Sequence, residues 1–164
     1  MEYVYVGKIV NTHGIKGELR IISNFERKSV FNPSNKLYIG DNKEEEVIST
    51  YRVHKEFDMV TFAGYDNINQ VLKYLNNKVY VNRDDLNLGD NDYLLEDLIN
   101  LNVMDNNKLV GKVTNIIYNN GNTLLFIEGD KSFYIPIKSN YISKVDLKNK
   151  VINTNNVEEL IIWK

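Results

Sequence analysis

The stretch VGKIVNTHGIKGELRI, residues 6–21, decides how the N-terminal part of this chain folds. Apolar and polar residues alternate on either side of the block T-H-G-I-K-G-E, and this pattern predicts strands over residues 2–10 and 17–23. The block holds Gly14 and Gly17, and two glycines three residues apart predict a tight turn that requires positive φ. The stretch therefore predicts two strands joined by a short loop.

Alternation also predicts the faces of the first strand and the positions of further strands. One face of the first strand carries Tyr3, Tyr5 and Gly7, and the other carries Val4, Val6 and Lys8. Further strands are predicted at residues 37–40, 47–53, 59–62 and 78–82, of which the middle two form a hairpin. Several strands within about 85 residues suggest a small closed barrel.

One helix interrupts these strands, in DNINQVLKYLNNK at residues 66–78. A single apolar stripe at helical spacing is formed by Ile68, Val71, Leu72 and Leu75. Asn67 followed by Gln70 resembles a capping box, and Asn76 with Asn77 suits a C-terminal stop.

The rest of the chain predicts a second β domain. A polar stretch, RDDLNLGDND, breaks the pattern, and we assign a first barrel to residues 1–86, a linker to 87–92 and a second barrel to 93–164. Hairpin turns are predicted at Asn120-Gly121 and Gly129-Asp130. The tail NVEELIIWK packs as a short helix or a final strand. The predicted fold class is all-β, with two small barrels and one short helix.

Composition and charge exclude several classes of function. The chain has no cysteine and two histidines, which excludes disulfide scaffolds, zinc ribbons, thiol nucleophiles and histidine-rich metal sites. It has no secretory signal and no apolar run near the ~20 residues of a membrane span, so we expect a soluble cytoplasmic protein without a membrane partner. The net charge of −2 argues against a protein held on nucleic acid mainly by phosphate neutralisation, although residues 1–36 and 131–150 are locally basic.

The glycine-rich block does not fit nucleotide binding or catalysis. A dinucleotide site or a P-loop would need a helix after the glycines, and here a strand follows. His13 and Glu18 could be imagined as an acid–base pair, but no nucleophile or orienting group accompanies them. We therefore expect no catalytic, cofactor or metal residues. Two interpretations stay open: His13 and Glu18 are structural, or His13, Lys16 and Arg20 form a rim that contacts phosphate or a carboxylate partner. His54 is expected to be structural.

The same stretch resembles the N-terminal signature of the RimM family, G-x-I-x-x-x-H-G-x-x-G-E. The matching residues, in order and spacing, are Gly7, Ile9, His13, Gly14, Gly17 and Glu18. The segment VTFAGYDNINQVLKYLNNKVYVNRDDL is similar to the end of the family's first barrel. The segments YLLEDLINLNV, LVGKVTNIIYNNGNTLLFI, FYIPI and YISKVDLKNKVI resemble its second domain, a PRC-type barrel.

This resemblance implies a non-enzymatic assembly factor for the small ribosomal subunit. It implies binding to late precursors through a ribosomal protein of the subunit head, a local contact with rRNA, and help in maturing the small-subunit rRNA. No cofactor is implied, and we expect a monomer. The second barrel is implied to carry the protein contact, for which Tyr93 and Leu94 are the predicted anchors.

The chain departs from the family pattern at two positions. The family often has two aromatic residues where this chain has Tyr93 and Leu94, and it has glycine where this chain has Asn100. Asparagine tolerates the left-handed region better than most residues, so we expect the turn at Asn100 to survive.

Two other functions compete with the assembly factor. One is a PRC-barrel interaction module of a non-ribosomal complex, against which the block around His13 speaks. The other is an enzyme that uses His13 and Glu18 on a small or phosphorylated substrate.

Overall fold

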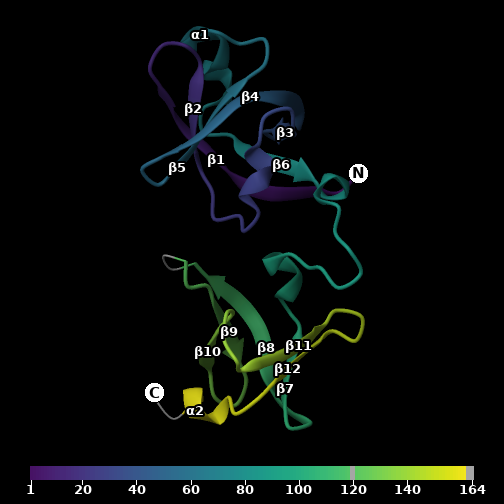
Figure 1. The fold of residues 1–164 in the computed structure, drawn as a ribbon. Coiled ribbons are helices and arrows are strands. Elements are labelled where there is room, and N and C mark those ends of the chain that lie inside the picture. The colour runs from purple at the N-terminus through teal and green to yellow at the C-terminus, as the bar shows by residue number, and fades with distance from the viewer. Residues whose placement is uncertain (119–120, 162–164) are drawn as a thin grey trace. The chain divides into compact units, whose positions relative to one another are not determined.

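The computed structural model describes residues 1–118 and 121–161, which form two compact units, Met1–Asp92 and Tyr93–Lys164 (Figure 1). Both units are built mainly from strands, and each contains a six-stranded sheet. The prediction of a mainly β chain with two β domains is confirmed. The finer assignment of a linker to residues 87–92 stays a proposal.

The first unit is a closed barrel with the strand order β1-β2-β5-β4-β3-β6. Strand β1 pairs antiparallel with both β2 and β6, and this double pairing closes the cylinder. The strands are β1 (Tyr3–His13), β2 (Glu18–Ile22), β3 (Lys36–Ile39), β4 (Glu44–His54), β5 (Phe57–Phe62) and β6 (Lys78–Asn82). Short 3-10 helices, η1 (Lys28–Phe31) and η3 (Arg83–Leu86), follow β2 and β6.

A β-bulge changes the faces that simple alternation assigns to β1. Its register against β6 shifts between Tyr5 and Gly7, so that Val6 and Gly7 together oppose Val79. Both bulged residues are buried, and Lys8 is exposed on the side of Tyr3 and Tyr5. The predicted faces of Gly7 and Lys8 were therefore wrong, because the extra residue reverses the side chains that follow it, up to a second register shift between Ile9 and Asn11.

Glycine is required at the bulge by a close approach of backbone. A Cβ on Gly7 would lie 2.6 Å from the carbonyl oxygen of Ile22. Apolar side chains make up most of the barrel interior beside it, with Asp58 as a buried charged residue of this unit. Each fully buried aliphatic or aromatic side chain contributes about 1.5–3 kcal/mol to folding. Members of the interior with at most 2% exposure include Val4, Val6, Ile9, Leu19, Ile21, Leu37, Ile48, Val60, Phe62 and Val79.

The predicted helix is present, but it is shorter and tighter than its apolar stripe suggests. Helix α1 (Ile68–Val71) continues as a 3-10 helix, η2 (Leu72–Tyr74). The capping box is confirmed, since the Asn67 side chain accepts from the Gln70 N–H and the Gln70 side chain accepts from the Asn67 N–H. The tighter 3-10 turn changes the direction in which the later side chains point, so Tyr74 is buried and Leu72 is exposed, contrary to the prediction.

The second unit contains a sheet with the order β10-β9-β8-β7-β12-β11. Its strands are β7 (Asn102–Asp105), β8 (Lys108–Ile117), β9 (Leu124–Glu128), β10 (Phe133–Pro136), β11 (Ile142–Asp146) and β12 (Val151–Thr154). Strand β12 pairs parallel with β7, and the other strand pairs among the described residues of this unit are antiparallel. The core of this unit contains Leu98, Val103, Val113, Leu125, Ile127, Ile135 and Ile152.

Turns and ends of the second unit agree with several expectations. Asn100 has φ 72°, the left-handed conformation that we expected it to tolerate, and its N–H donates to the carbonyl of Val113. The segment with Gly129-Asp130 connects β9 to β10 as a hairpin, whereas Asn120 of the other predicted turn lies outside the described residues. The tail forms a short helix, α2 (Glu158–Ile161). Within the described residues, no helix has the length and apolar character needed to cross a bilayer.

The bulge generates a prediction for stability. In Gly7→Ala, the new methyl group meets the backbone carbonyl of Ile22 and the fully buried side chain of Ile21, so we expect the free energy of unfolding to fall by about 1–3 kcal/mol. Urea denaturation followed by circular dichroism measures this change.

The matched control is Gly89→Ala, whose nearest neighbour is the movable carboxylate of Asp92 at 3.3 Å. We expect a change within about 0.5 kcal/mol for this variant. Equal unfolding midpoints for the two variants would contradict the role assigned to the bulge.

Candidate functional site

The block T-H-G-I-K-G-E forms the β1–β2 turn and joins the barrel to α1. Gly14 and Gly17 have φ 71° and 93°, so the predicted need for positive φ is confirmed. The carbonyl of Ile15 accepts from the N–H of Ile68 at 2.8 Å. A Cβ on Gly17 would sit 3.4 Å from the backbone of Asn67. The turn therefore rests on the start of the helix, and its second glycine allows that contact.

His13 is held by Arg20 on the neighbouring strand. A terminal nitrogen of the Arg20 guanidinium lies 2.8 Å from Nδ1 of His13. Because a guanidinium only donates, Nδ1 of His13 is the acceptor in this contact. Arg20 also lies over the ring of Phe57, 5.5 Å from its centroid. Its buried Nε has no hydrogen-bond partner among the described residues.

Glu18 is engaged with Arg52 and not with His13. Nε and a terminal nitrogen of Arg52 donate to the two carboxylate oxygens at 2.9 and 2.8 Å. This bidentate pair is the main cause that holds the pKa of Glu18 below its ordinary value. Within the described residues no hydrogen bond joins His13 to Glu18, although the two are cross-strand partners. An ionised carboxylate already occupied by a guanidinium is a poor general base.

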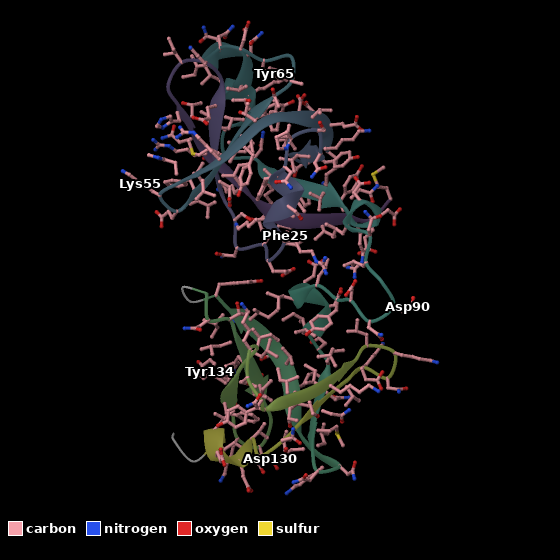
Figure 2. All side chains as sticks on the ribbon, in the orientation of Figure 1. Phe25, Lys55, Tyr65, Asp90, Asp130 and Tyr134 are labelled. Carbon is pink, nitrogen blue, oxygen red and sulfur yellow. The ribbon has the colours of Figure 1, made fainter. Side chains whose placement is uncertain are left out.

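The β4–β5 hairpin adds further side chains to the group around His13, and local sequence patterns did not predict this contribution. The ring of His54 lies 5.4 Å from the ring of His13, and Lys55 stands at the tip of the hairpin (Figure 2). Arg20 and Arg52 flank the buried Met59 in one row across β2, β5 and β4. Alternation along β4 does put Arg52 and His54 on one face, but only the pairing of β5 with β2 brings that face to His13.

The pKa of His54 is lowered from its ordinary value of 6.5. Desolvation contributes most, followed by the charges of Arg52, His13, Lys55 and Arg20. We call the group formed by His13, Glu18, Arg20, Arg52, His54 and Lys55 the histidine cluster. It is a cationic surface whose single carboxylate is already paired.

Lys16 lies in the turn beside the histidine cluster, with its side chain exposed. The structure therefore brings His13 and Arg20 into contact and leaves Lys16 as a separate cation on the adjacent turn. Ile15 next to it is 75% exposed. Among the described residues, no group of three or more acidic or histidine side chains is arranged to hold a metal ion.

The two residues proposed as anchors at the start of the second unit differ in accessibility. Leu94 is 0% exposed, and its N–H donates to the carboxylate of Asp97 at 2.8 Å. A side chain without accessible surface offers nothing to a partner, so Leu94 is reassigned to the core. Tyr93 is half-buried and packs against the core of the second unit. Of this pair, only Tyr93 keeps the surface that a contact needs.

The charges around His54 generate a prediction for its titration. Replacing Arg52 by glutamine removes one positive charge and leaves the carboxylate of Glu18 unpaired, and both changes favour protonated His54. We expect the pKa of His54 to lie below 6.5 in the unchanged protein and to rise in Arg52→Gln. The contribution of His54 to stability is therefore present above pH 6.5 and decreases as the pH falls below it.

Proton NMR titration of the His54 ring, in the unchanged protein and in Arg52→Gln, measures both pKa values. Lys131→Gln removes the same charge from the second unit and leaves the residues of the histidine cluster unchanged, so it should leave the pKa of His54 unchanged. An unaltered pKa in Arg52→Gln would show that the charges named here do not act on His54.

Comparison with known proteins places both units in one family. Residues 4–86 match the RimM N-terminal domain, and residues 95–160 match the RimM PRC barrel domain. A relative named ribosome maturation factor RimM from Staphylococcus haemolyticus is 38% identical over 164 residues, covering 96% of this chain and 98% of the relative. A relative of the same name from Staphylococcus aureus is 37% identical with the same coverage.

A solution structure of the N-terminal domain of RimM from Thermus thermophilus is 21% identical, with a TM-score of 0.45. It covers 52% of this chain and 95% of that domain. Family matches over both units, together with relatives above 30% identity along nearly their whole length, show that this chain belongs to the RimM family.

Proposed function

We propose that this protein is a non-enzymatic assembly factor for the small ribosomal subunit. It binds late precursors through a ribosomal protein of the subunit head and aids maturation of the small-subunit rRNA there. The observation that carries the proposal is the full-length match to relatives named ribosome maturation factor. Because the match includes the N-terminal domain over residues 4–86, it favours this role over an interaction module of a non-ribosomal complex.

The chemistry of the histidine cluster supports binding over bond breaking. His13 is held by Arg20, and Glu18 is held by Arg52, so the candidate acid–base pair is divided between two cations. The groups that remain accessible are cations on a rim, with Lys16 and Ile15 on the turn beside them. Such a rim suits a phosphate or a carboxylate of a partner.

The mechanism follows from differential affinity for two states of the subunit. A factor that binds the incomplete head better than the mature head shifts precursors toward the conformation it recognises. The factor is released when maturation of the subunit removes this difference in affinity. A chain with a net charge of −2 avoids bulk RNA and approaches a basic ribosomal protein readily, while its local cations meet phosphate at one place.

Sucrose-gradient sedimentation of lysates tests the function. We expect the unchanged protein to migrate with small-subunit precursors and to be depleted from mature small subunits. Absence from precursor fractions under low-salt conditions would refute the proposed function.

Two variants test the contact residues separately. Tyr93→Ala removes an accessible ring and should lower recovery on precursors about tenfold, as loss of an interface anchor does. Lys16→Glu should lower it about threefold, and more at low salt than at high salt. Lys108→Glu, the same charge change on the second unit, serves as the control with an expected change below about twofold. If Tyr93→Ala folds and sediments like the unchanged protein, Tyr93 is not an anchor.

A further inference from the structure

The outer face of strands β1 and β6 carries a group of tyrosines that the proposed function does not use. Tyr5 is 49% exposed and Tyr3 is 37% exposed, and Tyr80 stands directly opposite Tyr5 in the strand register. The two strands run side by side in the barrel (Figure 1). A single exposed aromatic residue is ordinary, but three in contact on one face form a surface that needs an explanation.

Contacts between the rings hold them in defined orientations. Tyr80 meets Tyr3 with centroids 6.5 Å apart and planes at 69°, and it meets Tyr5 at 6.0 Å and 73°. The buried Tyr38 also contacts Tyr3, with ring centroids 5.3 Å apart and planes at 63°. These edge-to-face contacts are favourable and restrict rotation of the rings. A flat ligand that stacks on Tyr3 or Tyr5 therefore loses little side-chain entropy.

Three lysines surround these rings. Nζ of Lys43 lies 4.2 Å from the ring centroid of Tyr80 and 5.5 Å from that of Tyr3. Lys8 and Lys78 face each other across the strand pair, and the bulge at Gly7 is what turns Lys8 to this side. Like charges directly opposite each other are unfavourable, so an anion placed between Lys8 and Lys78 relieves a cost of the free protein.

Carboxylates do not neutralise these lysines. In the part of the chain that the structure describes, none of Lys8, Lys43 and Lys78 forms an ion pair. Two acidic residues of the same unit are engaged elsewhere, since Glu2 pairs with Arg83 and Glu44 pairs with Lys73. The rings and the free cations together match a ligand that offers flat aromatic groups and negative charge along one strand.

We propose that this tyrosine face, formed by Tyr3, Tyr5, Tyr80, Lys8, Lys43 and Lys78, binds a short stretch of single-stranded RNA. Unpaired bases stack on the rings of Tyr3 and Tyr5, and the phosphates lie against the lysines. A duplex does not fit this surface, because its bases are stacked within the helix and unavailable. A basic protein segment is disfavoured, because the lysines that flank the rings repel it.

The inference rests on the proposed function only for the source of the RNA, the rRNA of an incomplete subunit. Its test uses purified components, so the two proposals fail separately. Loss of sedimentation with precursors would refute the function, whereas the measurements below concern the tyrosine face alone.

Fluorescence anisotropy with the purified full chain tests the site. The probes are a labelled 12-nucleotide oligo(U), a 12-base-pair RNA duplex and a polyphosphate of equal charge, which has phosphates without bases. We expect the single strand to bind at least tenfold more tightly than either of the other two. Its affinity should fall with salt with a logarithmic slope of about −2, as expected for three lysine–phosphate contacts on a single strand.

Substitutions separate stacking from charge. Tyr3→Leu/Tyr5→Leu keeps apolar bulk but removes both rings, and it should weaken binding of oligo(U) about tenfold or more. Tyr5→Phe keeps the ring and should bind within twofold of the unchanged protein. Lys8→Gln/Lys78→Gln should weaken binding and make the salt slope shallower. The matched control is Tyr134→Leu on the second unit, an equally exposed tyrosine (48%; labelled in Figure 2), for which no loss is expected.

Several results would overturn the inference. Equal binding of polyphosphate and oligo(U) would show that charge alone acts. Unchanged affinity in the folded double-leucine variant would remove the rings from the site, and the single variant Tyr5→Leu decides the same point if the double variant unfolds. Failure to bind oligo(U), or preference for a proline-rich or basic peptide over it, would equally refute a single-stranded RNA site.

Discussion

Strand β1 has to pair along both of its edges, and the close approach of backbone at Gly7 is what allows it. The carbonyl of Ile22 occupies the place where a side chain at Gly7 would project, 2.6 Å from the position of its Cβ. The bulge there lets Val4, Val6 and Ile9 all reach the interior, while β2 and β6 keep their hydrogen bonds on either side. Glycine at this position therefore permits the bulged pairing inside the closed barrel.

The same bulge distributes functional side chains over two surfaces of one barrel. Before it, β1 presents Tyr3 and Tyr5 beside β6, and after it Lys8 joins them on that side. At its C-terminal end β1 places His13 in contact with Arg20 on β2 and with His54 on β4. Tyr3 and Tyr5 stand near the N-terminal end of this 11-residue strand, whereas His13 stands at its C-terminal end. One element therefore couples the positions of both surfaces without placing them in contact.

Local signals in the sequence predicted what depends on local physics. Alternation located the strands, the pair Asn67 and Gln70 located the start of α1, and Asn100 does adopt the left-handed conformation expected for it. Features set by pairing between distant strands were not predictable in this way. The bulge that turns Lys8, the proximity of His54 to His13 and the pairing of Glu18 with Arg52 all depend on which strands become neighbours. The 3-10 tightening that exposes Leu72 and the burial of Leu94 depend on packing.

Free and paired charges on this protein are consistent with a contact that forms and is later broken. Two carboxylates with little accessible surface are already satisfied: Asp58 by Lys28 and Tyr51, and Glu18 by Arg52. Exposed cations such as Lys8, Lys16 and Lys78 remain for a partner on a chain whose overall charge is slightly negative. Each contact of an exposed cation with a phosphate is modest in energy and sensitive to salt.

A small number of such contacts gives affinity that a change in the partner can outweigh. Loss of about 1.4 kcal/mol is enough for a tenfold weaker complex. In the proposed function, loss of a single stacked base or a single anchor as the subunit matures would supply a change of that size. A strongly basic protein would instead gain most of its affinity from phosphates that persist in the mature particle, and it would leave slowly. Near-neutral charge with a few placed cations and rings thus suits the reversible recognition of an incomplete particle that we propose.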